Sequence, residues 1–167
     1  MTKPTINYLE ILKTLRRHKV DFIVVGGVCA VLHGAPLAAF DLDVVHSRET
    51  GNLTRLWMSF RPLGAHYRIP ARQTEIPGLS ELASTGHHLL MTRFGPLDLL
   101  GAIGKGRDYD QLRNESVEMQ VGTSLVVRVA TLECLIKTKE ESGLEIDQAA
   151  LPVLRRVSEE KSKSSDF

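Results

Sequence analysis

Short apolar runs alternate with polar and glycine-containing stretches in the first 46 residues, and this pattern predicts helix, strand, helix and strand in turn. Apolar residues at helical spacing between positions 6 and 15 predict a first helix, with Thr5 as its cap. The run "DFIVVGG" at 21–27 predicts a short strand that ends in a glycine pair. "VCAVLHG" at 28–34 predicts a short helix, and "AFDLDVVH" at 39–46 a second strand.

The middle of the chain predicts one helix and then two pairs of strands. "NLTRLWMSFRPL" at 52–63 has the apolar spacing of a helix, whereas residues 62–86 are rich in Gly, Pro and polar residues and predict a long, partly irregular connection. "HHLLMTRFGPLDLL" at 87–100 predicts two strands around a Gly95–Pro96 turn. "SVEMQV" and "SLVVRV" flank Gly122 and predict a hairpin.

Two helices are predicted after the hairpin. Thr131 opens the first, over "LECLIKTKEE", and Gly143 ends it; the second runs through "QAALPVLRRV", with Pro152 in its first turn or at a bend. The pattern as a whole predicts an α/β (α+β) fold, in which a mixed sheet is flanked by helices. We expect one domain over residues 1–158 and, because residues 159–167 are almost entirely polar, a disordered tail.

Composition changes this picture little. The 167 residues are 43% hydrophobic and 25% charged with a net charge of +1, so a polynucleotide substrate is neither indicated nor excluded. Cys29 and Cys134 have no CxxC spacing, which favours two reduced thiols. No apolar run has the length of a membrane span, and the first residues lack the apolar core of a signal peptide, so we expect a cytoplasmic protein.

Two carboxylates, Asp41 and Asp43, interrupt the apolar run at 39–46. Side chains alternate along a strand, so these acids share one face while Phe40, Leu42 and Val44 share the other. Their Cα atoms would lie about 6.6 Å apart, at a rise of ~3.3 Å per residue. Neighbouring carboxylates repel each other and lose hydration, which a divalent cation between them would offset. The pair therefore predicts a metal site.

Asp98, again a single acid among apolar strand residues, is the candidate for a third ligand. Two-metal phosphoryl-transfer sites use such carboxylate sets, with the ions ~3.5–4 Å apart. The rival pair Asp108 and Asp110 fits a solvated helix start better. Gly26 begins a helix, so backbone N–H groups there can face a phosphate, although a glycine pair alone is more typical of a tight turn.

The segments "VVGGVCAVLHG", "FDLDVV" and "FGPLDLLG", in this order, resemble the nucleotidyltransferase superfamily of DNA polymerase β. More narrowly, they resemble small bacterial proteins of this fold related to the toxins of abortive-infection systems. The similarity runs from about residue 20 to 157. It implies transfer of a nucleoside monophosphate from a nucleoside triphosphate, such as ATP, to an acceptor hydroxyl. It also implies two Mg²⁺ ions and the minimal nucleotidyltransferase fold.

The resemblance also implies roles for individual residues. Asp41 and Asp43 would bind both metal ions, Asp98 would be the third ligand near the acceptor hydroxyl, and Gly26 and Gly27 would contact the triphosphate. Lys139 corresponds to a lysine of the relatives that meets the phosphates. From the sequence itself, Lys105 in a glycine-rich loop either contacts phosphate or acceptor or belongs to a flexible charged loop.

The sequence departs from the relatives before the acidic strand, where "HGAPLAAFDLD" has Leu37 in place of arginine and Ala39 in place of threonine. This departure keeps a second function open, a nucleotide-binding or protein-interaction module with little or no turnover. For an active enzyme, the basic residues around Arg68 and Arg72 suggest RNA, tRNA in particular, as a polymeric acceptor, or else a solvated loop. A toxin-type enzyme would also have an antitoxin protein as its partner.

Overall fold

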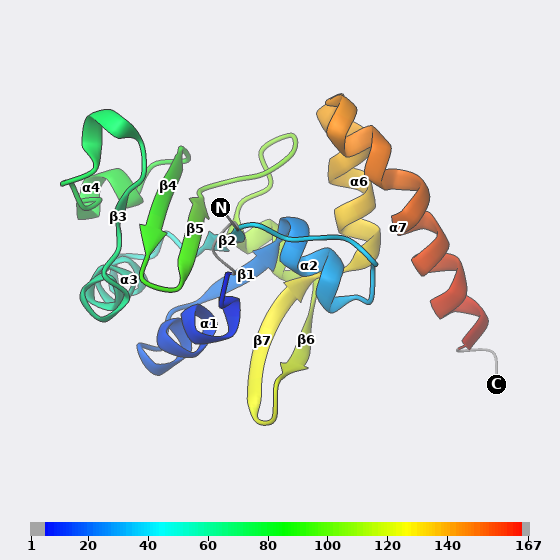
Figure 1. The fold of residues 1–167 in the computed structure, drawn as a ribbon, viewed down its shortest axis with the longest axis horizontal. Coiled ribbons are helices and arrows are strands. Elements are labelled where there is room, and N and C mark those ends of the chain that lie inside the picture. Colours follow the sequence, from blue (N-terminus) through cyan, green and yellow to red (C-terminus); the bar gives the residue numbers. More distant parts are fainter. Residues whose placement is uncertain (1–5, 165–167) are drawn as a thin grey trace, which may run out of the picture.

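A mixed sheet of seven strands organises residues 6–164, the part of the chain that the computed structural model describes (Figure 1). Its order is β3-β4-β5-β2-β1-β7-β6, and the pairs β2–β5 and β1–β7 are parallel while the others are antiparallel. The mixed sheet predicted from the sequence is thus confirmed. The strands are β1 (Phe22–Val25), β2 (Leu42–His46), β3 (His66–Tyr67), β4 (His87–Thr92), β5 (Gly95–Leu100), β6 (Ser116–Val121) and β7 (Leu125–Ala130).

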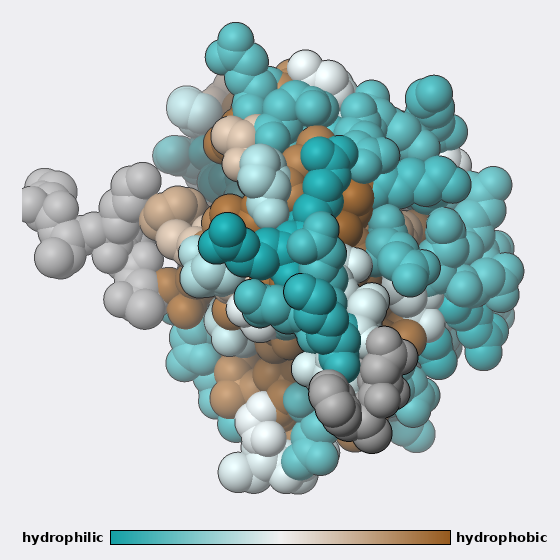
Figure 2. Space-filling model, turned by 90° about the vertical axis from the view of Figure 1, so that its right-hand side faces the viewer, coloured by the Kyte–Doolittle hydropathy of each residue, from teal (hydrophilic) through white to brown (hydrophobic). Residues whose placement is uncertain are grey.

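Helices flank this sheet, and the last two of them pack against each other beside it, at the right of Figure 1. In Figure 2 that side faces the viewer and is mostly hydrophilic, with apolar areas between the polar side chains. No described helix is both long and apolar enough to span a bilayer. The helices are α1 (Tyr8–Arg17), α2 (Gly26–Leu32), α3 (Thr50–Leu63), α4 (Leu79–Leu82), α5 (Tyr109–Arg113), α6 (Leu132–Ser142) and α7 (Glu145–Ser164), with a 3₁₀ turn at Pro70–Arg72.

Apolar side chains of the core cover one face of β2 and β5. Leu42 and Val44 of β2 and Leu97 and Leu99 of β5 are fully buried. Burial of such a side chain stabilises the fold by about 1.5–3 kcal/mol. Because side chains alternate along a strand, Asp43 and its partner Asp98 are directed to the opposite face, on which Val45 and Ile23 are also fully buried.

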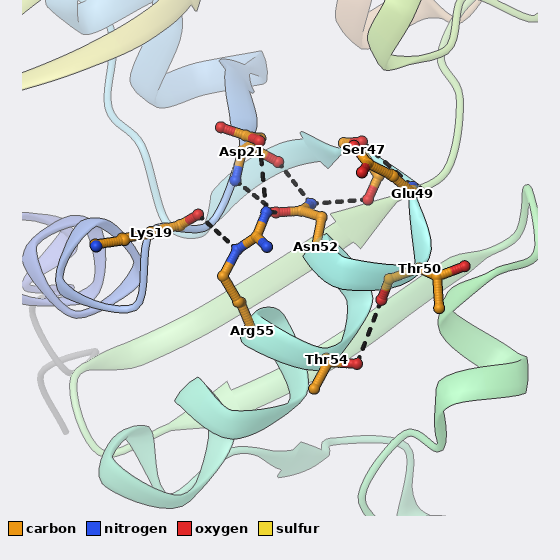
Figure 3. Close-up of polar contacts among 8 residues, drawn as sticks. All are labelled: Lys19, Asp21, Ser47, Glu49, Thr50, Asn52, Thr54 and Arg55. Carbon is orange, nitrogen blue, oxygen red and sulfur yellow. Dashed lines mark hydrogen bonds and ion pairs between the residues drawn. The ribbon is translucent and has the colours of Figure 1, made fainter.

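The buried side-chain amide of Asn52, in α3, connects the start of β1 with the end of β2 (Figure 3). Its Oδ1 accepts a hydrogen bond of 2.7 Å from the N–H of Asp21, just before β1. Its Nδ2 donates to the carbonyl oxygens of Asp21 at 3.0 Å and Ser47, just after β2, at 2.8 Å. Arg55 adds a bond of 3.0 Å from Nε to the Lys19 carbonyl. This network secures the antiparallel pairing of β1 with β2.

Several elements differ in detail from the prediction. Strand β2 begins at Leu42, so Phe40 precedes it and is 62% exposed instead of sharing the buried face. The hairpin between β4 and β5 turns at 93–94, and Gly95 and Pro96 already belong to β5. Residues 62–86 are more regular than expected, because β3 pairs there with β4 and α4 follows.

The two ends of the chain also differ from the expectation. Thr5 lies outside the described residues, and the side chain of Asn7 caps α1 instead, accepting a hydrogen bond from the N–H of Glu10. The expected tail is helical as far as Ser164, and residues 165–167 lie outside the description. Glu159 and Lys163 are spaced i,i+4, which favours helix. Pro152 lies within α7 and not in its first turn.

Candidate functional site

Three carboxylates meet where β2 and β5 run side by side. The parallel pairing of these strands sets Asp43 directly opposite Asp98. Asp41 lies two residues before Asp43, just ahead of β2. One oxygen of each side chain lies within 4.8 Å of an oxygen of the other two. The structure therefore brings together the three acids that the sequence predicted as a set.

Burial and mutual repulsion act on these acids. Desolvation, followed by the charge of Asp98, raises the pKa of Asp41. Desolvation, followed by the charges of Asp41 and Asp98, raises the pKa of Asp43 well above its usual range. The positive charge of Arg68 lowers both values, but not enough to cancel the rise. The fold thus carries a cluster whose full ionisation is unfavourable without added positive charge.

The donor set fits a hard divalent cation. All three side chains offer carboxylate oxygens, which Mg²⁺ prefers, and their oxygens are already close enough to share an ion. A dication bound there would offset the repulsion that raises the two pKa values. Asp41, Asp43 and Asp98 are therefore the residues that would hold Mg²⁺, and the local chemistry favours its binding.

Gly26 lies directly against this cluster, at the end of β1. Its φ of +69° is in the left-handed region, and a Cβ added there would overlap the Oδ2 atom of Asp43. Only glycine allows both the backbone conformation and the close approach of the carboxylate. Gly27 has a different environment, because a Cβ there would lie 3.5 Å from the Cβ of Ala39, an ordinary contact.

A cavity of about 180 Å³ opens beside Gly26 and Asp43, between the sheet and α6. Its polar lining includes Lys139, whose Nζ lies 3.0 Å from Asp147 Oδ1. Desolvation tends to raise the pKa of this carboxyl, but the Ser142 hydroxyl, which donates to Asp147, and the ion pair with Lys139 together lower it. Lys105 is exposed in the loop after β5, and it is Gly104 that lines the cavity. The cavity is also lined by Val25, Leu100, Ile103, Ala130, Cys134, Leu135 and Thr138.

Two solved structures match this architecture over nearly their whole length. One is TM1012 of Thermotoga maritima, assigned as a nucleotidyltransferase, with a TM-score of 0.58 and 15% identity over 93% of this chain and 96% of that one. The other is the lincosamide antibiotic adenylyltransferase LnuA in a lincomycin-bound structure, with a TM-score of 0.59 and 15% identity over 90% and 95%. The chain has the nucleotidyltransferase fold. No family model and no curated protein matches its sequence.

The resemblance to DNA polymerase β-like nucleotidyltransferases is thus confirmed at the level of fold, and the acidic triad is present. The two departures from the relatives have structural counterparts in this nucleotidyltransferase fold. Leu37 and Ala39 are partly buried and pack against the core. The segment before the acidic strand therefore contributes apolar packing at the two positions where the resemblance leads us to expect an arginine and a threonine.

Arg68 is a residue of this site that sequence reasoning assigned elsewhere. It follows β3, and its Nη1 donates to Asp98 Oδ1 and, at 3.0 Å, to the carbonyl oxygen of Leu90. The hydrogen bond to Asp98 raises the pKa of the guanidinium. Thirty positions separate Arg68 from Asp98 in the chain, and nothing in the local pattern around "YRIP" signals this contact.

Proposed function

We propose that this protein is a Mg²⁺-dependent nucleotidyltransferase that moves a nucleoside monophosphate from a nucleoside triphosphate to an acceptor hydroxyl, with release of pyrophosphate. The observation that supports this most is the meeting of Asp41, Asp43 and Asp98 within 4.8 Å, beside a cavity of the nucleotidyltransferase fold. A purely structural role would not assemble three repelling acids in one partly buried place.

In this proposal each residue has a distinct task. Asp41 and Asp43 bind two Mg²⁺ ions through their carboxylate oxygens, and Asp98 completes the set and accepts the proton of the attacking hydroxyl. Bound Mg²⁺ supplies positive charge that offsets the negative charge developing on the phosphate oxygens. Gly26 lets the backbone come close to the substrate at the cavity wall. Lys139 leaves its ion pair with Asp147 and contacts the phosphates as a point charge.

Pyrophosphate release tests this assignment directly. The purified protein is incubated with Mg²⁺, each labelled nucleoside triphosphate and candidate acceptors, and labelled acceptor and pyrophosphate are quantified. Asp43→Asn and Asp98→Asn should lower turnover by at least about a hundredfold, as loss of a group that stabilises the transition state does. Asp110→Asn, at an exposed acid of α5, is the matched control and should retain full activity. Retained turnover in either cluster variant would refute the proposal.

A nucleotide-binding module with little turnover is the second candidate, and the apolar packing of Leu37 and Ala39 favours it. The two candidates differ in the outcome of two measurements. Calorimetry with Mg²⁺ and each triphosphate detects binding in both cases, whereas pyrophosphate release occurs only with the enzyme. Tight binding without release over a broad set of acceptors would favour the module.

Two classes of acceptor, small molecules and RNA, are candidates, and experiment can distinguish them. For LnuA the acceptor is a lincosamide antibiotic, so hydroxylated small molecules are one class to supply. Transfer RNA is the polymeric acceptor that we propose, with a toxin-type activity and an antitoxin protein as partner in a cytoplasmic setting. Arg68 and Arg72 are in ion pairs within the protein, so other cations would have to hold the tRNA. Transfer to tRNA should then weaken steeply with salt.

A further inference from the structure

Hydrogen bonds from both its backbone and its side chain hold Arg68 in place at the acidic cluster. Its backbone N–H donates to the Leu89 carbonyl at 3.1 Å, which continues the pairing of β3 with β4. Its guanidinium donates to the carbonyl oxygen of Leu90 and to Asp98. Since Leu89 is in register with Asp98, the arginine reaches the carboxylate across the neighbouring strand. The pairing of the strands therefore positions the contact between Arg68 and Asp98.

The main chain around Arg68 is anchored independently of this contact. Arg72 donates to Glu75 at 2.7 Å and to Glu81 at 3.0 Å, and its guanidinium carbon lies 4.1 Å from the centre of the Tyr67 ring. The Tyr67 hydroxyl donates to Glu81 at 3.1 Å. The segment would keep its place if the Arg68 side chain left Asp98.

The guanidinium and a divalent cation would use the same oxygens. Asp98 is 6% exposed, and Arg68 donates to its Oδ1 atom, one of only two oxygens that the side chain offers. A metal ion at the cluster would meet both an occupied ligand atom and a positive charge a few ångströms away. At such distances in a partly buried site, like charges repel strongly.

We propose that Arg68 is the built-in counter-ion of the metal site, which a divalent cation displaces from Asp98. The inference rests on the proposed metal-dependent function and adds to it a residue that sets metal affinity. Arg68 lowers the repulsion among the acids while the site holds no metal, and its side chain swings away on binding while the segment around Arg72 stays fixed. The arginine therefore stabilises the metal-free fold and weakens the binding of the metal ion.

Mn²⁺ binding, followed by electron paramagnetic resonance of the free ion, tests this directly. Arg68→Gln keeps a polar side chain but removes the charge, and it should bind Mn²⁺ about tenfold more tightly than the wild type. Arg68→Lys keeps the charge and should stay close to the wild type. Arg155→Gln is the control, because this arginine of α7 is also in an ion pair, but with Glu140, an acid outside the cluster. It should leave Mn²⁺ affinity unchanged.

Equal or weaker Mn²⁺ binding by Arg68→Gln, with a wild type that binds, would overturn this inference alone. No binding by any of the proteins would overturn the proposed function together with it. A second measurement uses the wild type and does not depend on the variant being folded: nuclear magnetic resonance of the arginine Nε–H groups during a Mg²⁺ titration. The Arg68 signal should shift as the ion pair opens. An unchanged Arg68 signal while the Asp43 amide shifts would also overturn the inference.

Discussion

Replacing Gly26 by alanine isolates the close contact between backbone and acid at the centre of the site. Gly26 has φ +69°, a conformation that costs a residue with a Cβ about 1–2 kcal/mol. Its added Cβ would in addition overlap the Asp43 carboxylate, and such overpacking typically costs about 1–3 kcal/mol. Gly26→Ala should therefore lower the free energy of unfolding by about 2–5 kcal/mol and displace Asp43.

Gly143→Ala provides the matched control at the end of α6. Gly143 has nearly the same φ, +68°, but no atom lies within 4 Å of its added Cβ. The backbone cost and the effect of alanine on the unfolded chain are then the same in both variants and cancel in the comparison. The excess destabilisation of Gly26→Ala measures the contact with Asp43 alone.

Urea denaturation followed by circular dichroism gives both free energies, and Mn²⁺ titration gives the functional consequence. We expect Gly143→Ala to bind Mn²⁺ like the wild type and Gly26→Ala to lose at least about tenfold in affinity, since one of its three ligands has moved. Equal destabilisation of the two variants, together with unchanged Mn²⁺ binding by Gly26→Ala, would refute the reasoning.

Three further predictions concern the stability of the fold. Arg107 lowers the pKa of Glu141 to about 2, so the ionised Glu141 stabilises the fold fully above its unfolded pKa of about 4.3. This contribution to the free energy of unfolding should fade as the pH falls from about 4.3 to about 2. In urea denaturation, Glu141→Gln should lack this part of the pH dependence. Asn52→Ala leaves buried polar groups without partners and should cost about 2–3 kcal/mol in the same assay, against less than about 0.5 kcal/mol for the exposed Thr54→Ala. Leu97→Ala should cost about 2–5 kcal/mol, and a loss below 1 kcal/mol would contradict its place in the core.

The elements that the sequence predicts well are those with local signals. Helix α6 begins after Thr131, whose hydroxyl accepts a hydrogen bond from the N–H of Cys134, and ends at Gly143 in the left-handed conformation. Asp108 caps α5, which confirms the reading of that acid as a helix start. Caps, turns and alternation depend on neighbours a few residues away, so the sequence carries them directly.

The partners of the basic residues depend on the path of the chain, even where the acid is near in the sequence, and here the sequence is a poor guide. Arg68 and Arg72 look like a solvated or RNA-binding stretch, but the structure pairs them with Asp98, Glu75 and Glu81. The ion pair of Lys139 with Asp147 is similarly invisible in the helix pattern of α6. A cation reaches whichever acid the tertiary fold brings near, and that choice is made by strand order and loop path.

The acidic site depends on strand register, which is only partly predictable from the sequence, unlike the local signals of caps and turns. Side chains alternate along β5, so a shift of one residue against β2 would direct Asp98 to the buried face of Leu99 and leave Asp43 without its neighbour. The hairpin with β4 fixes the register of β5 against β4, and its turn is closed by the Thr92 hydroxyl, which donates to the Gly95 carbonyl at 2.7 Å. A lone acid in an apolar strand is visible in the sequence. Its meeting with the other acids depends on the parallel pairing of β5 with β2, which joins segments about fifty residues apart, and no local pattern shows that pairing.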